Sequence, residues 1–160
     1  MDSKFIYLVQ HGEAIDKETN SSRPLTEKGI ETVQTMGKFL QEHNCKVDVI
    51  WHSPKLRARE TAEILSSCLG IEASSINEYK ELEPNEPIKK TIKLIQKSLE
   101  QSIMLVGHLP HLSRLAGLLL CENENKEIIA FQKGGVVCLE SQEPGVSVVH
   151  WILVPSLFVY

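Results

Sequence analysis

Hydrophobic positions follow two alternating patterns along this chain of 160 residues. Short, mostly apolar runs lie at 5–9, 47–51 and 103–106, and their length and composition are those of buried strands. Around these runs, apolar residues recur every three or four positions, which indicates the buried face of a helix. Strands that alternate with helices favour a parallel sheet covered by helices on both faces.

Four helices are predicted from these patterns and from the residues that open them. Thr26 caps a helix with apolar residues at positions 30, 33, 37 and 40. Ser53 is the expected cap of the second helix, with Pro54 at its first position. Pro87 and Pro110 open the third and fourth helices. The expected core face of the third helix consists of Ile88, Ile92, Ile95 and Leu99.

The end of the chain is predicted to form an antiparallel strand pair. The apolar segments 136–140 and 146–154 flank a Glu-Pro-Gly turn at 143–145. This pair makes the sheet mixed. We therefore expect a single domain over residues 1–160, an α/β three-layer sandwich with a mostly parallel mixed sheet and helices on both faces.

Composition narrows the classes of partner and location. The formal net charge is −4, so no basic excess supports nucleic-acid binding. No apolar stretch is long enough to span a membrane, and the first residues lack the apolar core of a signal peptide. The four cysteines are scattered without a Cys-x-x-Cys pair, which favours reduced thiols in a cytoplasmic protein.

Two predicted strands each deliver a histidine at their carboxyl end. His11 follows the first strand and precedes Gly12, while His108 follows the run 103–106 and Gly107. Ligands of open α/β sheets bind at the carboxyl ends of the strands. The sequence therefore predicts a site built on imidazole.

The second predicted helix separates its two arginines. Its apolar row is formed by Ala58, Ala62, Leu65 and Leu69. Arg57 lies beside this row near the helix start, and there it needs a buried anionic partner or a ligand. Arg59 faces water together with Glu60 and Glu63, and it can pair with Glu63 four positions on. Arg23, in the loop before the first helix, is another candidate cation.

Two histidines and an inward arginine suit phosphoryl transfer. An imidazole nitrogen can attack phosphorus, and the phosphoimidazole that forms is labile enough to hydrolyse. A second imidazole and a guanidinium would stabilise the oxygens of the transferring group. The alternative is that each histidine is an ordinary hydrogen-bonded residue of the fold. The chain contains no nucleotide-binding glycine loop and no serine-hydrolase motif.

A metal site is a weaker alternative for the same residues. His108 and His111 have i, i+3 spacing, and His11 could be a third ligand. The intervening proline disturbs the local helix and no carboxylate is placed to support the ligands, so we expect no metal. His52, before Ser53, could border the site, but we expect it at the surface; His43 at a helix end and His150 in a strand are expected in ordinary structural positions.

Three ordered motifs resemble those of the histidine phosphatase superfamily, which also contains the phosphoglycerate mutases. Val9-Gln10-His11-Gly12-Glu13 is similar to its first strand, which ends in Arg-His-Gly. Residues 53–62 are similar to its Ser-x-x-x-Arg-Ala-x-x-Thr-Ala helix start, and residues 106–108 to its later Gly-His strand end. Residues 23–26 and 108–110 most resemble the small bacterial phosphohistidine phosphatases.

The resemblance implies a role for each matching residue. His11 is the implied nucleophile, which becomes phosphorylated. Arg57 and His108 complete the implied phosphate pocket, and Arg23 adds a contact special to the small subgroup. Gln10 occupies the position of a phosphate-binding arginine.

The resemblance also implies the remaining parts of the reaction. Larger members carry an acidic proton donor in the region of Glu81 and Glu83, of which Glu81 is the first candidate. The implied substrate is a phosphohistidine-bearing protein, such as a histidine-containing phosphotransfer domain or a phosphocarrier protein acting in signal transduction. No metal or organic cofactor is implied.

Gln10 keeps two other functions open. Glutamine offers one neutral amide where arginine offers a charged fork, and losing a charge-assisted hydrogen bond costs roughly 1.5–3 kcal/mol. The chain could therefore be a catalytically weakened member that binds phosphorylated groups. It could also be a phosphatase of small phosphate esters. We favour the phosphohistidine phosphatase, with Arg23 compensating for Gln10.

Overall fold

The computed structural model describes residues 3–143 and 146–158. In this part of the chain six strands form one sheet in the order β3-β2-β4-β1-β5-β6. Neighbours among β1 to β4 are parallel, whereas β5 is antiparallel to both β1 and β6. The strands are β1 Lys4–Gln10, β2 Val49–His52, β3 Ile76–Glu78, β4 Ser102–Gly107, β5 Val136–Glu143 and β6 Val146–Leu153.

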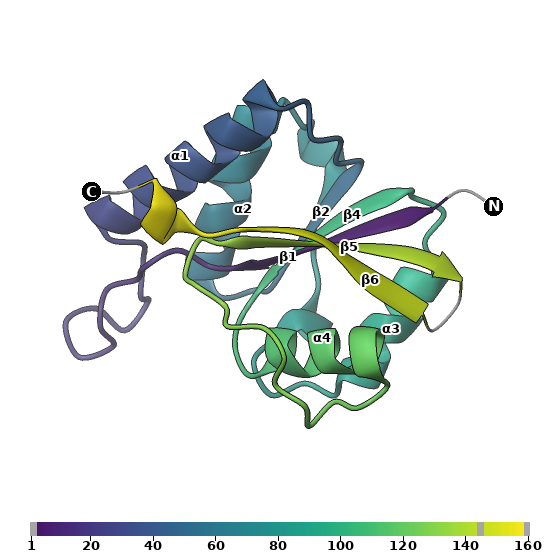
Figure 1. The fold of residues 1–160 in the computed structure, drawn as a ribbon. Helices are drawn as coiled ribbons and strands as arrows, with labels where there is room; N and C mark the ends of the chain where they lie inside the picture. Colours follow the sequence, from purple (N-terminus) through teal and green to yellow (C-terminus); the bar gives the residue numbers. More distant parts are fainter. Residues whose placement is uncertain (1–2, 144–145, 159–160) are drawn as a thin grey trace.

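Four α-helices cover the two faces of this sheet. Figure 1 shows α1 and α2 on one side and α3 and α4 on the other, which confirms the predicted three-layer α/β fold with a mixed sheet. None of the helices within the described residues is long and apolar enough to cross a membrane. The helices are α1 Glu27–Glu42, α2 Leu56–Leu69, α3 Ile88–Lys97 and α4 His111–Cys121.

Each face of the central strands has its own hydrophobic core. Along β1, Ile6 and Leu8 pack toward α3 and α4, while Tyr7 and Val9 pack toward α1 and α2. A strand with both faces buried needs apolar residues at every position, which explains the continuous runs at 5–9 and 103–106. The two cores hold the carboxyl ends of β1 and β4 rigidly side by side.

The start of α1 lies directly against the segment that follows His11. Thr26 caps the helix as predicted, because its hydroxyl accepts a hydrogen bond from the Gly29 amide at 2.9 Å. A side chain at Gly29 would collide with the carbonyl oxygen of Glu13. Glycine is therefore needed here for the close approach of helix and loop.

Three details of the predicted elements are wrong. Helix α2 begins at Leu56 and its cap position is Lys55, because Ser53 makes other contacts. Leu99 lies beyond the last turn of α3 and is 93% exposed, so it is not part of the core. Ile30 is 37% exposed, so it lies at the edge of the core and not within it. The three-residue strand β3 has too few residues to show a pattern and was not predicted.

The antiparallel pair at the end of the chain is confirmed by β5 and β6. The central residues of its expected turn, 144 and 145, lie outside the described residues. The cysteines all carry free thiols: Cys45, Cys68, Cys121 and Cys138.

Candidate active site

Three neighbouring parallel strands end at one place on the sheet. The order β2-β4-β1 puts the next residues, Ser53, His108 and His11, side by side with His108 in the middle. Backbone hydrogen bonds continue past the strand ends, since the His11 amide donates to Gly107 and the Ser53 amide to Val106. The His11 and His108 ring centroids are 5.1 Å apart, so the structure brings the two predicted histidines together.

The hydrogen bonds of His11 determine which of its ring nitrogens is protonated. Nδ1 lies 2.7 Å from the carbonyl oxygen of Gly12, which can only accept, so Nδ1 carries the proton. Nε2 accepts a hydrogen bond from Nε of Arg57 at 3.3 Å. The unprotonated nitrogen of His11 therefore faces a guanidinium, which is the arrangement an attack on a bound phosphoryl group requires.

Both histidines are electrically neutral at neutral pH. Burial is the main cause that lowers the pKa of His11 to about 4; the hydrogen bond to Gly12 raises this pKa, and nearby cations lower it. Burial is also the main cause that lowers the pKa of His108 to about 3, and the neighbouring His11, Arg57 and Lys55 lower it further. The cations that act on His11 are Arg57, Lys133 and Arg23.

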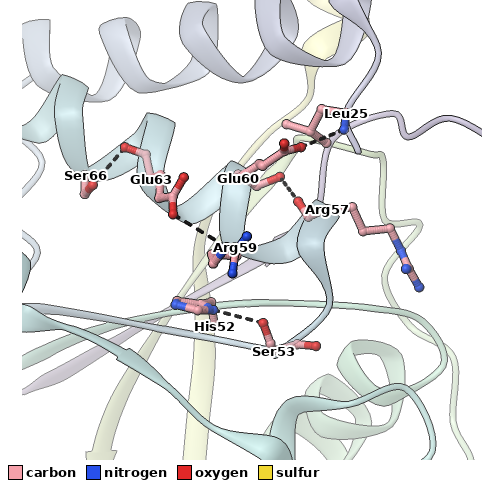
Figure 2. A network of polar contacts seen from close by, with 9 residues as sticks. Leu25, His52, Ser53, Arg57, Arg59, Glu60, Glu63 and Ser66 are labelled. Carbon is pink, nitrogen blue, oxygen red and sulfur yellow. Dashed lines mark hydrogen bonds and ion pairs between the residues drawn. The ribbon is translucent and has the colours of Figure 1, made fainter. Parts of the chain in front are cut away.

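Arg57 reaches the site from the first turn of α2. In Figure 2 its side chain extends away from the polar contacts of Glu60 and Glu63. Burial is the main cause that lowers the pKa of Arg57, followed by the charge of Arg23. The Thr61 hydroxyl donates to the Arg57 carbonyl at 2.7 Å and accepts from the Gly12 amide at 3.0 Å. Thr61 thus links the start of α2 to the backbone beside His11.

Arg23 belongs to a loop that is fixed to α2. The Leu25 amide donates to the Glu60 carboxylate at 2.7 Å, a contact drawn in Figure 2. Glu60 was predicted to face water, and this is wrong because the loop folds over that side of the helix. Arg23 has a φ of 51° and its Nε donates to the Ile15 carbonyl at 3.1 Å. By contrast, the predicted pair of Arg59 and Glu63 forms at 3.7 Å.

Gln10 and the acidic segment complete the surroundings of the two histidines. Gln10 is buried, its carbonyl accepts from the Gly134 amide at 2.8 Å, and its side chain makes no hydrogen bond with any residue that the structure describes. Glu81 lies in the short helix η2, Lys80–Leu82. A Cβ placed on Gly107 would lie 3.5 Å from the Leu82 carbonyl, so η2 packs against the end of β4.

Comparison with known proteins identifies the family. The sequence model of the histidine phosphatase superfamily (branch 1) matches residues 6–102. The chain belongs to this superfamily. Phosphohistidine phosphatase SixA of Escherichia coli (strain K12) is 26% identical over 154 residues, which cover 94% of this chain and 93% of that protein. This histidine phosphatase is thus assigned to the phosphatases, which are hydrolases.

Solved structures share the fold of this histidine phosphatase. The protein histidine phosphatase SixA complexed with tungstate superimposes with a TM-score of 0.86 at 23% identity, covering 97% of this chain and 99% of that chain. Phosphoglycerate mutase from Plasmodium falciparum superimposes with a TM-score of 0.64 at 24% identity, covering 94% and 91% of the two chains. These likenesses show a phosphoglycerate mutase-like fold.

Other histidines of this histidine phosphatase take part in structural contacts. His52 is buried and its Nδ1 lies 2.9 Å from the Ser53 carbonyl, so the expected surface position is wrong. His111 is 0% exposed and its Nε2 lies 3.0 Å from the Thr91 hydroxyl. No cluster of three or more metal-ligating side chains occurs within residues 3–143 and 146–158.

Four residues near the site were not identified from the sequence as functional candidates: Ser53, Lys55, Thr61 and Lys133. Lys133 precedes β5, whose first residues lie beside the end of β1 because the two strands are antiparallel. That topology was the signal for Lys133, and finding it required pairing the first strand of the C-terminal hairpin, β5, with β1. Ser53 and Thr61 belong to the motif at residues 53–62. Their hydrogen-bond partners, His108 and Gly12, are distant in sequence, so the motif alone does not reveal these contacts.

Proposed function

We propose that this histidine phosphatase hydrolyses phosphohistidine on a protein through a phosphorylated His11. The observation that carries this proposal is the contact between the unprotonated Nε2 of His11 and the Arg57 guanidinium, 3.3 Å away. A guanidinium binds two phosphoryl oxygens at once, so Arg57 would hold the phosphorus in front of the nucleophile. His108, 5.1 Å away between ring centroids, would contact the same group.

The reaction consists of two displacements at phosphorus. In the first, the Nε2 electron pair of His11 forms a bond to phosphorus while the bond to the substrate imidazole breaks, and that imidazole leaves with a proton. In the second, water attacks phospho-His11, releases inorganic phosphate and restores the neutral ring. We assign the proton donor to Glu81, whose helix η2 packs on the end of β4; Glu83 is the alternative.

Two considerations support a protein substrate. The relative that matches 94% of this chain is a phosphohistidine phosphatase by name. Imidazole is also a better leaving group than an alkoxide, so a phosphohistidine places a smaller demand on the acid than a phosphate ester does. The partner would be a histidine-containing phosphotransfer domain or a phosphocarrier protein. A small phosphate ester is the competing substrate.

Gln10 favours a second candidate function, a protein that binds phosphorylated groups and turns them over poorly. Its amide carries no charge, and arginine stands at this position in the family motif. The two candidates differ in whether phosphate is ever transferred to His11.

Rapid-quench labelling tests the proposal. Mixing the enzyme with a ³²P-phosphohistidine protein should give an acid-labile, base-stable label on His11 within one turnover. His11→Ala should abolish label and hydrolysis, whereas His43→Ala, at an exposed helix end, should change neither. A panel with p-nitrophenyl phosphate and sugar phosphates ranks the substrates. Full hydrolysis by His11→Ala would refute the mechanism, and tight binding without label would favour the binding protein.

A further inference from the structure

The two ring nitrogens of His108 have very different surroundings. Nε2 lies 2.8 Å from the hydroxyl oxygen of Ser53. Nδ1 is buried and has no hydrogen-bond partner among the described residues. Ser53 is itself 0% exposed, and its hydroxyl accepts a hydrogen bond from the Lys55 amide at 3.2 Å. The protonation of this pair can be worked out from these contacts.

The Ser53 hydroxyl has one proton to donate. The Lys55 amide already occupies one of its electron pairs, and in the described part of the chain Nε2 of His108 is the sole acceptor within reach of that proton. If His108 instead donated from Nε2, the hydroxyl proton and the Nδ1 electron pair would both be buried without partners. If Ser53 donates, only the Nδ1–H group is unpartnered. Buried polar groups are rarely left unpaired, so the second arrangement is favoured.

We propose that Ser53 is a positioning residue that holds His108 as the Nδ1–H tautomer, so that this N–H donates to an oxygen of the phosphoryl group bound beside His11. The strand order supports this direction, because β4 lies between β2 and β1 and Ser53 and His11 therefore flank His108. The other tautomer would turn an electron pair toward the anion. This inference rests on the proposed phosphate site, but not on the identity of the substrate.

The charges around His108 are consistent with a neutral ring. Burial lowers its pKa to about 3, and the positive charges of Arg57 and Lys55 act in the same direction. A neutral ring has one donor and one acceptor, and Ser53 decides which nitrogen is which. The role of Ser53 as predicted helix cap is thus replaced by a role in the site.

The tautomer can be measured in the unmodified protein by ring ¹⁵N chemical shifts. At pH 7 His108 should show a protonated Nδ1 and an unprotonated Nε2. Inorganic phosphate or orthovanadate should shift Nδ1–H strongly and leave Nε2 on Ser53. An Nε2–H tautomer in the wild-type protein overturns the proposal. An Nδ1 chemical shift that does not change at a saturating anion concentration overturns it as well. Neither measurement depends on turnover.

Variants of Ser53 connect the tautomer to catalysis. Ser53→Ala should mix the two tautomers and lower kcat about tenfold, with KM changed less than about threefold, because the lost donor acts mainly on the transferring group. Ser53→Thr keeps the hydroxyl and should restore both readouts. Ser66→Ala is the matched control, since Ser66 is also a buried serine and its hydroxyl donates to the Glu63 carbonyl at 2.8 Å.

The outcomes separate this inference from the proposed function. If Ser53→Ala keeps a pure Nδ1–H tautomer and full activity, Ser53 does not position His108. If the tautomer changes as expected but His11 is never labelled, the inference about Ser53 stands and the phospho-His11 mechanism fails. Should Ser53→Ala not fold, the wild-type spectra alone still decide the tautomer.

Discussion

Position 10 shows how a neutral residue can be tolerated in an anion site. Gln10 lacks the charge of the family arginine, yet three cations act on His11: Arg57, Lys133 and Arg23. The backbone next to Lys133 is held against Gln10, because the Gly134 amide donates to the Gln10 carbonyl at 2.8 Å, and the Lys133 side chain is exposed. The lysine therefore lies next to the residue whose charge is missing. We infer that it supplies that charge to the phosphoryl group.

Lys133→Met should consequently lower kcat/KM about tenfold, the effect of losing one charge-assisted contact. Gln10→Arg should change the wild-type enzyme less than about threefold, but it should restore most of the activity of Lys133→Met. Steady-state kinetics of the two single variants and the double variant measure this coupling. Lys38→Met, on the exposed side of α1, makes the same change in net charge and should be silent. If the effects of the two substitutions on kcat/KM were additive, Lys133 would not compensate for the missing charge of Gln10. A large gain in kcat/KM from Gln10→Arg alone would contradict that compensation as well.

The sequence predicts some site residues far better than others. His11, His108 and Arg57 each follow a strand or open a helix, so their local pattern already points them toward one sheet edge. Ser53 also stands at a strand end, but a serine before a proline has an equally good local use as a helix cap. Only the order β2-β4-β1 shows that Ser53 lies beside His108. Contacts between distant strand ends leave no periodic signal in the chain.

Helix α2 positions several parts of the site within two turns. Arg57 points to His11, Thr61 binds the Gly12 amide, and Glu60 binds the Leu25 amide of the loop that carries Arg23. Thus α2 sets both the cations and the backbone around the nucleophile. Glu60 is not part of either hydrophobic core, so its contact with the loop can be tested without disturbing the core.

Glu60→Ala should loosen the 15–25 loop and with it Arg23. We expect KM to rise about tenfold, because about 1.4 kcal/mol of binding corresponds to one hydrogen bond to a charged group, and kcat to fall less. Glu60→Gln keeps a carbonyl acceptor for Leu25 and should stay within about threefold of wild type. Kinetics and proteolysis of the loop provide the measurements.

Glu63→Ala is the matched control for Glu60, one turn further along the same helix. Glu63 pairs with Arg59 at 3.7 Å and both side chains are half exposed or more, so the pair contributes little. Equal effects of the Glu60 and Glu63 variants on KM would show that the loop contact has no special role.

At the level of elements, length decides what can be predicted. The buried runs of β1 and β4 and the apolar faces of α1 and α2 are long enough to be unambiguous. Strand β3 has three residues, and its assignment depends on pairing with β2. Leu99 fits the helical spacing of α3, but the helix ends at Lys97. Sequence periodicity cannot mark that end because Ser98 caps it without glycine.

Among the residues that the structure describes, His11, His108 and His111 are buried histidines whose pKa is lowered, so their protonation is coupled to folding. Burial is the main cause that lowers the pKa of His11 and His111 to about 4 and of His108 to about 3, from 6.5. Below pH 6.5 the unfolded chain binds protons that the folded protein excludes. The free energy of unfolding must therefore fall as the pH falls from 6.5 toward 4, by about 1.4 kcal/mol per pH unit for each such group.

His111 allows this effect to be followed by protein stability alone, because its ring contacts Thr91 and has an unpartnered, buried Nδ1 among the described residues. The Thr91 hydroxyl donates its one proton to the Glu81 carbonyl at 3.1 Å, so toward His111 it can only accept. Nε2 of His111 therefore carries the proton and donates to Thr91, and Nδ1 is unprotonated. His111→Gln can keep a donor for Thr91 while removing the titrating ring. Between pH 6 and 4.5, this variant should have a smaller slope of unfolding free energy against pH. The expected reduction is about 1.4 kcal/mol per pH unit, which corresponds to one proton fewer taken up on unfolding.

Urea unfolding at several pH values measures that slope directly. The variant should lose less stability than the wild type on acidification, whatever its stability at pH 7. His43→Gln, at an exposed helix end, controls for the loss of a histidine as such. An unchanged slope in His111→Gln would mean that the ring is already protonated in the folded state near pH 6. In that case the buried chain from His111 through Thr91 to Glu81 would have to be paired differently from the arrangement described above.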